Sequence, residues 1–150
     1  MGLSEPSNLL KVFIADDSPI VRQRLATMLL ELEGIEIIGQ AQNSVETCES
    51  VQSLNPDVVI LDIVMCGRSR IDLLSTIKRN AFAPIVIVFT NSPYPQYRKK
   101  CLEQGADFFL DKCRESRKLI EVVRQLISDS LTHSAANLEE EVQQERESVR

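Results

Sequence analysis

One stretch of the sequence constrains the fold more than any other: residues 55–62, which read Asn-Pro-Asp-Val-Val-Ile-Leu-Asp. A turn-forming dipeptide leads into four apolar residues, and the apolar run ends at the carboxylate of Asp62. A short, unbroken apolar run predicts a strand that is buried on both faces. Such strands lie inside the sheets of α/β proteins, where functional groups collect at the carboxyl ends of the strands. We therefore expect Asp62 to lie at a functional edge of a sheet.

Strand and helix patterns alternate along the rest of the chain. Patterns typical of strands cover residues 11–15, 35–41, 58–61, 85–89 and 107–110. Apolar residues at helical spacing predict helices near residues 19–33, 43–54, 69–78, 96–104 and 116–131. Residues 63–69 and 91–95 are expected to be loops. Five strands, each followed by a helix, predict an α/β fold with a doubly wound, five-stranded parallel sheet and right-handed crossovers.

Capping residues mark the expected helix ends. Ser18 is the expected N-cap of the first helix, and Gly34 is expected to end that helix as a C-cap. Asn43 with Glu46 three residues later resembles a capping box for the second helix. Ser69 is the expected cap of the third helix.

Composition excludes several classes of protein. The formal net charge is −5, and residues 134–150 hold five glutamates against two arginines. Because an acidic chain without a basic face is a poor nucleic-acid binder, we expect no direct DNA binding. The longest apolar run, residues 85–89, is too short to span a bilayer, and no signal peptide is visible, so we expect a cytoplasmic protein without membrane insertion. Four scattered cysteines and one histidine predict neither disulfides nor a zinc site.

Polar residues follow four of the five predicted strands. Asp16 and Asp17 follow the first strand, Asp62 the third, Thr90 the fourth and Lys112 the fifth. Because parallel strands end at one edge of a sheet, we expect these five side chains to meet. Clustered carboxylates repel one another unless a cation neutralises them, and Mg²⁺ prefers such hard oxygen ligands. A cation beside a lysine and a hydroxyl predicts a phosphoryl-transfer site.

Four motifs stand at these strand ends. They are Phe-Ile-Ala-Asp-Asp-Ser at 13–18, Val-Ile-Leu-Asp-Ile-Val-Met at 59–65, Val-Phe-Thr at 88–90 and Gly-Ala-Asp-Phe-Phe-Leu-Asp-Lys at 105–112. Together, in this order and spacing, they resemble the receiver domains of two-component response regulators. The resemblance covers residues 11 to about 130. It implies a flavodoxin-like fold with strand order 2-1-3-4-5.

The resemblance also implies a role for each polar residue. Asp62 would be the phosphoacceptor and would attack a phosphohistidine on a partner kinase to form an acyl phosphate. Lys112 would pair with a phosphoryl oxygen. Asp17 would ligate Mg²⁺ directly, Asp16 would do so through water, and Val64 would contribute its backbone carbonyl.

Two further positions would form a switch in a protein of this family. Thr90 would move to hydrogen-bond the phosphoryl group, and Phe109 would turn inward behind it. This coupling would bias the face formed by residues 96–131 between two states. The resemblance thus implies a phosphorelay protein with a sensor histidine kinase or phosphotransfer protein upstream and a protein partner downstream. Such a protein is not an enzyme in the usual sense, because it catalyses only its own phosphorylation and dephosphorylation.

The chain divides into three expected parts. Residues 1–10 are an expected flexible lead-in, residues 11–131 the receiver domain, and residues 132–150 an acidic tail. A tail of this length cannot hold a DNA-binding helix-turn-helix domain, so we expect a stand-alone receiver. The composition favours a disordered tail, because an isolated charged helix this short is marginal. The alternative is an extension of the last helix that pairs with a second copy to form a homodimer.

Four positions depart from the family's pattern around the expected site. Cys66 and Cys113 stand where proline is common, and Arg70 stands where glycine is usual. Asn91 replaces a small residue and is expected to narrow access to the phosphoacceptor. Cys66 and Cys113 are expected to be buried, inert thiols, with redox-reactive thiols as the alternative.

Three other functions are rivals to this interpretation, and residues of the sequence argue against each of them. A pseudo-receiver would keep the fold and signal by protein contact without phosphorylation; Asn91 and Arg70 favour it, whereas the intact set of five polar residues argues against it. A haloacid-dehalogenase-like phosphatase would need a second acid two residues after its nucleophile, where this chain has Val64. A flavodoxin-like FMN carrier would need a hydroxyl- and glycine-rich phosphate loop where this chain has Asp16 and Asp17.

Overall fold

A five-stranded parallel sheet forms the centre of the protein. The computed structural model describes residues 9–131, so the expectations for residues 1–8 and 132–150 lie outside the described residues. The sheet runs in the order β2-β1-β3-β6-β7, and all four strand pairs are parallel. With the two short strands β4 (Val64–Met65) and β5 (Arg68–Ser69) set aside, this is the expected order 2-1-3-4-5. The strands are β1 (Leu10–Ala15), β2 (Ile35–Ala41), β3 (Val58–Leu61), β6 (Ile85–Thr90) and β7 (Phe108–Asp111).

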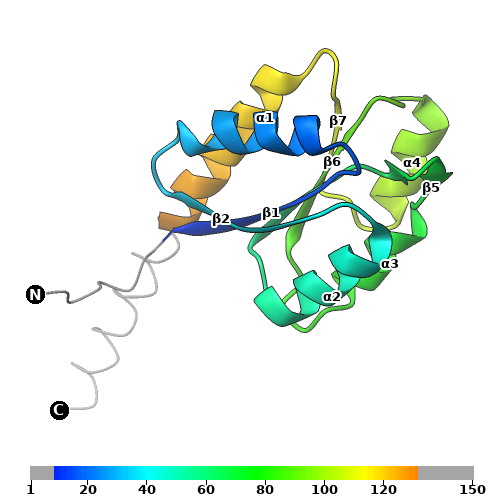
Figure 1. Ribbon diagram of the computed structural model, residues 1–150, viewed down its shortest axis with the longest axis horizontal. Helices are drawn as coiled ribbons and strands as arrows, with labels where there is room; N and C mark the ends of the chain where they lie inside the picture. The colour runs from blue at the N-terminus through cyan, green and yellow to red at the C-terminus, as the bar shows by residue number, and fades with distance from the viewer. Residues whose placement is uncertain (1–8, 132–150) are drawn as a thin grey trace, which may run out of the picture.

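Helices cover both faces of the sheet, as a doubly wound fold requires. Helix α1 (Pro19–Leu30) and the last helix, residues 116–131, lie on one face (Figure 1). Helices α2 (Ser44–Leu54), α3 (Asp72–Lys78) and α4 (Pro95–Glu103) lie on the other face. No helix within residues 9–131 combines the length and the apolar character needed to cross a membrane.

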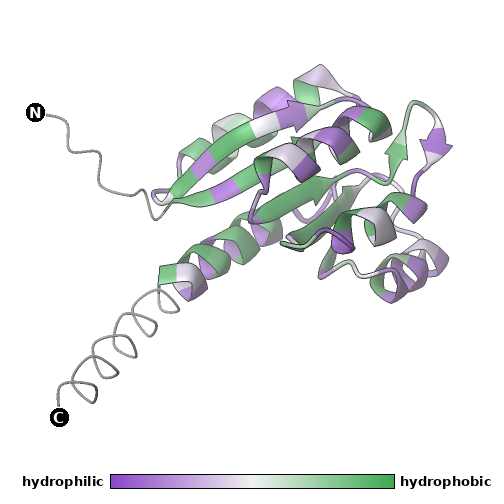
Figure 2. Ribbon diagram, turned by 90° about the horizontal axis from the view of Figure 1, so that it is seen from below, coloured by the Kyte–Doolittle hydropathy of each residue, from purple (hydrophilic) through white to green (hydrophobic). Residues whose placement is uncertain are grey.

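Strand β3 is buried on both faces, which confirms the expectation from its unbroken apolar run. All four of its residues are at most 1 % exposed. Val59 and Leu61 belong to the core cluster under α2, α3 and α4, whereas Val58 and Ile60 belong to the cluster under α1 and the last helix. The sheet strands are accordingly mostly hydrophobic, whereas hydrophobic and polar residues are mixed along the helices (Figure 2).

The helix N-caps at Ser18 and Asn43 are confirmed, but the first helix ends earlier than expected. The Ser18 hydroxyl accepts a hydrogen bond from the Val21 N–H at 3.3 Å, and the Asn43 side chain accepts one from the Glu46 N–H at 2.9 Å. Helix α1 ends at Leu30 rather than at Gly34. Gly34 lies in the turn that enters β2, with φ +97°, and its carbonyl accepts a hydrogen bond from the N–H of residue 10 at 2.8 Å.

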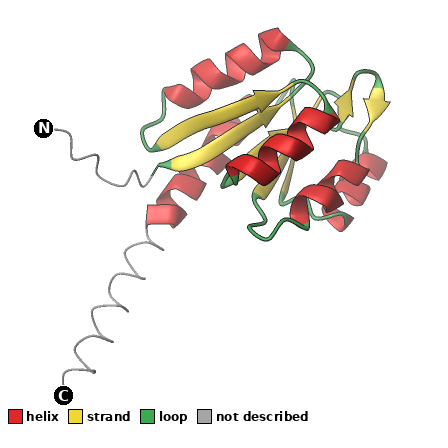
Figure 3. Cartoon of the chain, turned by 60° about the horizontal axis from the view of Figure 1, so that its bottom comes forward, coloured by secondary structure: helices red, strands yellow, loops and turns green. Residues whose placement is uncertain are grey.

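The expected loop at residues 63–69 is a β-hairpin. Strands β4 (Val64–Met65) and β5 (Arg68–Ser69) pair antiparallel, and this hairpin projects from the end of the main sheet (Figure 3). The two turn residues, Cys66 and Gly67, have φ of +55° and +73°, as a type I′ turn requires. Because Ser69 lies in β5, it does not cap α3, whose N-cap residue Ile71 makes no side-chain capping bond.

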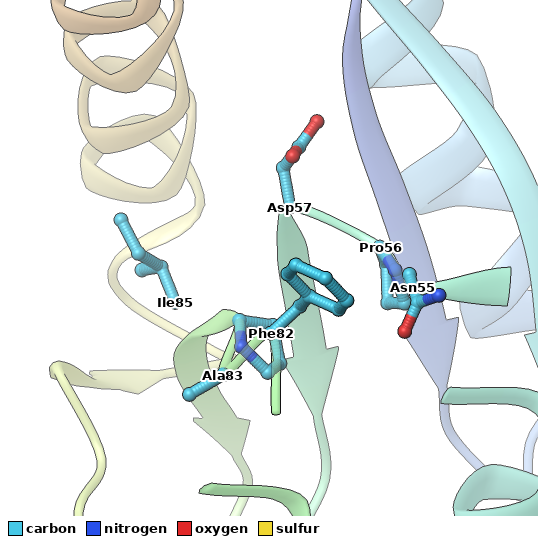
Figure 4. A pocket seen from close by; sticks show the side chains of 7 residues that line it. Asn55, Pro56, Asp57, Phe82, Ala83 and Ile85 are labelled. Carbon is cyan, nitrogen blue, oxygen red and sulfur yellow. The ribbon is translucent and has the colours of Figure 1, made fainter. Parts of the chain in front are cut away.

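A shallow hollow lies at the amino ends of β3 and β6, at the opposite end of the sheet from Asp62. Its volume is about 480 Å³, and its lining includes Pro56 and Phe82, which is 71 % exposed (Figure 4). The carboxylate of Asp57, which also lines this hollow, accepts a hydrogen bond from the Lys11 N–H at 2.8 Å. That contact ties β1 to the start of β3, so the Asp57 carboxylate has a structural role.

Candidate functional site

The five polar residues predicted to meet do lie together at the carboxyl edge of the sheet. Backbone hydrogen bonds continue past the strand ends, from the Asp62 N–H to the Ala15 carbonyl at 2.9 Å and from the Lys112 N–H to the Thr90 carbonyl at 2.8 Å. These bonds fix the chain at the points where the polar side chains begin. The resulting hollow has a volume of about 280 Å³ and is lined by Asp16, Asp17, Ser18, Val21, Asp62, Val64, Thr90, Asn91, Ser92 and Lys112.

Lys112 joins two of the carboxylates. Its Nζ lies 2.6 Å from Asp16 Oδ2 and 2.8 Å from Asp62 Oδ2. The side chains are 10 % exposed for Lys112, 3 % for Asp16 and 8 % for Asp62, so water screens these ion pairs little. One ammonium group therefore connects β1, β3 and the segment that follows β7.

Burial and the ion pairs, respectively, shift the pKa values of Asp62 and Lys112 upward. Burial raises the pKa of Asp62, and the hydrogen bonds from Lys112 and from the Val64 N–H oppose that rise without cancelling it. Burial lowers the pKa of Lys112, but its hydrogen bonds and attraction to Asp16 and Asp62 outweigh burial, so the net shift is upward. The Asp62 shift therefore comes mainly from burial, with a small contribution from the Asp16 charge, whereas the Lys112 shift comes from its two carboxylate partners.

A backbone N–H donates to each of the three carboxylates. Asp16 Oδ1 accepts from the Ser18 N–H at 2.9 Å, and Asp62 Oδ1 accepts from the Val64 N–H at 3.0 Å. Asp17 Oδ2 accepts from the Cys66 N–H at 3.0 Å, at the tip of the β4–β5 hairpin. Sequence reasoning did not find this last contact, because it joins residues 49 positions apart through a turn that was expected to be an irregular loop.

The carboxylate cluster fits a divalent cation. One oxygen from each of Asp16, Asp17 and Asp62 can be chosen so that all three lie within 4.8 Å of one another. Two of the three side chains are buried, and one ammonium group does not balance three carboxylates. Mg²⁺ binds to a few carboxylates together with waters and phosphate oxygens, so this donor set suits it. The chain therefore has an acidic pocket of the kind expected for Mg²⁺.

The two expected switch residues are both buried, but only Thr90 lines the hollow. Thr90 is fully buried and lines the hollow, and its Oγ1 accepts a hydrogen bond from the Ser92 N–H at 3.0 Å. Phe109 is 5 % exposed and packs in the core cluster that contains Cys101 of α4, outside the lining of the hollow. The Phe109 carbonyl accepts a hydrogen bond from the Arg98 guanidinium at 3.4 Å, which links its backbone to α4.

The departures from the family's pattern are distributed between this site and its surroundings. Asn91 lines the hollow, and its Oδ1 accepts a hydrogen bond from Cys113 Sγ at 3.3 Å. Arg70 instead lines a separate hollow between α2 and α3. The expectation that Cys66 and Cys113 are buried is wrong: both are exposed, because Cys66 occupies a hairpin turn and Cys113 lies in the turn after β7.

Comparison with known proteins identifies the family. The family described as "Response regulator receiver domain" matches residues 12–124. An uncharacterized response regulatory protein of Vibrio cholerae is 35 % identical over 119 residues, which are 79 % of this chain and 49 % of that protein. The nitrate/nitrite response regulator protein NarL of Escherichia coli is 26 % identical over 136 residues, which are 91 % of this chain and 62 % of NarL.

Solved structures agree with the family assignment. The signal receiver domain of the putative response regulator NarL from Mycobacterium tuberculosis has a TM-score of 0.72 at 22 % identity, over 80 % of this chain and 97 % of that one. CheY in the CheX–CheY–BeF3–Mg complex of Borrelia burgdorferi has a TM-score of 0.69 at 29 % identity, over 78 % of this chain and 88 % of that one.

This chain belongs to the response regulator receiver domain family, whose members act in phosphorelay signalling. It spans about half to three-fifths of the length of the first curated relatives, 49 % and 62 %. These relatives therefore carry further sequence beyond the part that this chain matches.

Removal of one carboxylate is expected to stabilise the protein when no divalent cation is present. Asp17→Asn keeps an oxygen that accepts the Cys66 N–H and removes repulsion between carboxylates that lie within 4.8 Å. Because Asp17 is exposed to water, Coulomb's law gives a gain of about 1 kcal/mol in the free energy of unfolding, measured by urea titration in EDTA. Asp107→Asn is the matched control, because it removes the carboxylate that pairs with Lys78 at 2.8 Å and is expected to lower stability. A loss of stability in both variants would contradict the repulsion.

The four cysteines are expected to differ in reactivity. At pH 8, a chromogenic disulfide reagent should modify Cys66 and Cys113 rapidly, because both are exposed. Cys101 should react only after unfolding, because it is fully buried and burial raises the pKa of its thiol to about 11. Burial and nearby acidic groups also raise the pKa of Cys48, so it should react slowly. Cys66→Ala should remove one fast equivalent, and an unchanged fast count would contradict the exposure of Cys66.

Proposed function

We propose that this receiver accepts a phosphoryl group on Asp62 from a partner histidine kinase or phosphotransfer protein. The observation that carries the proposal is the pairing of Asp62 with Lys112 at 2.8 Å, within a pocket that also holds Asp16 and Asp17. Asp62 is buried and lies directly after β3, so its carboxylate is held at a fixed position at the edge of the hollow. A carboxylate held in this way can act as a covalent nucleophile.

The chemical step exchanges one bond to phosphorus for another. A carboxylate oxygen of Asp62 attacks the phosphorus of phosphohistidine, a P–O bond forms, the P–N bond breaks, and the released imidazole keeps the electron pair and takes up a proton. The ammonium group of Lys112 now pairs with two carboxylates. In this proposal, it also pairs with a phosphoryl oxygen and stabilises the negative charge on that oxygen. The same residues later admit water, which hydrolyses the acyl phosphate. The chain thus catalyses only its own phosphorylation and dephosphorylation.

The proposed cation ligands are the carboxylates of Asp16, Asp17 and Asp62 and the backbone carbonyl of Val64. The close grouping of the three carboxylates supports the first three, and the position of Val64 in the lining of the hollow supports the fourth. When bound, Mg²⁺ supplies positive charge that offsets both the carboxylates and the incoming phosphoryl oxygens.

Thr90 and Phe109 are proposed to transmit the phosphorylated state to one face of the protein. Thr90 ends β6 and lines the hollow, and Phe109 lies on the neighbouring strand β7 beneath α4. Movement of the Thr90 hydroxyl toward the phosphoryl group would open space that the Phe109 ring can fill. The face formed by α4, β7 and residues 116–131 would then shift between two states and signal to a downstream protein.

The proposed output is contact with another protein in the cytoplasm, without direct DNA binding by this chain and without membrane insertion. The net charge of −5 supports this view, because binding to the phosphate backbone requires a basic surface. A homodimer formed by this chain is one form that the contact can take. Gel filtration of the phosphorylated and unphosphorylated chain distinguishes a change of oligomeric state from binding to a different partner.

Phosphorylation is tested by intact mass after incubation with acetyl phosphate and Mg²⁺. One phosphoryl adduct is expected on the wild type and none on Asp62→Asn, because that change removes the nucleophilic carboxylate. Asp57→Asn is the matched control, since Asp57 lies at the opposite end of the sheet, and it should retain the adduct. No adduct on a wild type shown to be folded by circular dichroism would instead favour a pseudo-receiver that signals without phosphate.

The switch is tested by separating phosphorylation from its readout. Thr90→Val keeps the shape of the side chain and removes its hydroxyl, whereas Thr90→Ser keeps the hydroxyl. Both variants should form the adduct, but only Thr90→Ser should retain the phosphorylation-dependent change in the amide spectrum of α4, measured by nitrogen-15 NMR. The proposed role of Thr90 fails if Thr90→Val shows the same spectral change as the wild type.

A further inference from the structure

Asp17 is held differently from the other two carboxylates of the cluster. Asp16 and Asp62 each pair with Lys112 and also accept a backbone N–H from within two residues of their own position. Asp17 makes no ion pair with Lys112, and its carboxylate is exposed. Within residues 9–131, its side chain has one polar contact, the hydrogen bond from the Cys66 N–H at 3.0 Å. The orientation of Asp17 therefore depends on the β4–β5 hairpin.

The hairpin places this N–H through its turn geometry. Val64 pairs with Ser69 and Met65 pairs with Arg68, so Cys66 and Gly67 form the turn. The φ of Cys66 is +55°, in the left-handed region that non-glycine residues seldom occupy. The backbone conformation of Cys66 aims its N–H at Asp17 Oδ2, whereas its own side chain is exposed to solvent.

Proline at position 66 would be incompatible with this contact for two reasons. Proline has no backbone N–H to donate, and its ring holds φ near −65°. The Cys-Gly sequence at positions 66 and 67 permits both the donor and the two positive φ values. This contact therefore requires a backbone N–H in a left-handed conformation at position 66, and the thiol takes no part in it.

We propose that the β4–β5 hairpin is a positioning element for the cation site, and that it acts through the backbone N–H of Cys66 on the carboxylate of Asp17. This inference rests on the cation site of the proposed function. A carboxylate with one oxygen fixed by a hydrogen bond presents its other oxygen in a defined direction, so less conformational freedom is lost when a cation binds. By linkage, a cation bound to Asp17 stabilises the hairpin to the same extent.

The experiment measures Mg²⁺ affinity of the full chain by isothermal titration calorimetry, without any phosphodonor. Cys66→Ala keeps the N–H and should bind Mg²⁺ within about twofold of the wild type. In a second variant, lactic acid replaces the alanine at position 66, so that an ester oxygen stands in place of the N–H. This ester variant should bind Mg²⁺ about tenfold more weakly than the wild type, as expected when the hydrogen-bond partner of a metal ligand is removed. Cys66→Pro should show at least the same loss.

A second readout does not depend on the cation. Hydrogen exchange followed by NMR in EDTA should show the Cys66 amide protected by about tenfold in the wild type, and this protection should be lost in Asp17→Ala, which removes the acceptor. Lost protection in Asp17→Ala supports the contact even if the ester chain does not fold. An amide that exchanges equally fast in both proteins would overturn it.

The outcomes separate this inference from the proposed function. If the wild type binds Mg²⁺ and the ester variant binds it equally tightly, the positioning role is rejected while the receiver function stands. If Cys66→Ala loses as much affinity as the ester variant, the side chain rather than the N–H is responsible, and the proposal is also rejected. If the wild type binds no Mg²⁺ at millimolar concentration, the cation site itself fails, and the positioning role fails with it.

Discussion

The ammonium group of Lys112 is the interaction on which the functional edge of this protein depends. It contacts Asp16 and Asp62, which lie 96 and 50 residues away in the sequence and follow different strands. A buried carboxylate without a partner costs free energy. Burial of Asp16 and Asp62 is therefore favourable only when Lys112 is buried beside them. Yet Asp17 adds a third carboxylate that Lys112 does not pair with. The edge of the sheet is therefore held together while remaining short of positive charge, which is a suitable state for receiving a cation and an anionic phosphoryl group.

Much of this arrangement follows from local sequence signals. The strand at residues 58–61 is recognisable because an unbroken apolar run is required by burial on both faces, and its ending at Asp62 follows from the same pattern. Once five strands are expected in parallel, the polar residues that follow them are expected to meet, because parallel strands end at one edge of a sheet. Side-chain caps such as Asn43 are also local, since donor and acceptor lie only three residues apart.

The features that could not be predicted depend on backbone conformation or on contacts between distant residues. Cys66 has no intrinsic preference for a left-handed φ, so the hairpin turn and the bond to Asp17 are visible only in the folded chain. The exposure of Cys66 and Cys113 follows from these turns rather than from the apolar character of the residue. Helix α1 ends four residues before Gly34, and Gly34 instead lies in the turn into β2, where its carbonyl pairs with the start of β1.

Lys112 alone does not neutralise the three carboxylates at this edge. A thermal melt with increasing Mg²⁺ tests most directly whether they bind a divalent cation. Because Mg²⁺ binds the native site, the free energy of unfolding should rise by about 1.4 kcal/mol when Mg²⁺ reaches ten times its dissociation constant. NaCl at equal ionic strength serves as the control for general screening and should give a smaller change. The predicted result is a melting temperature that rises with Mg²⁺ in the millimolar range. A melting temperature that does not change with Mg²⁺, or changes equally with NaCl, would contradict a cation site formed by these carboxylates.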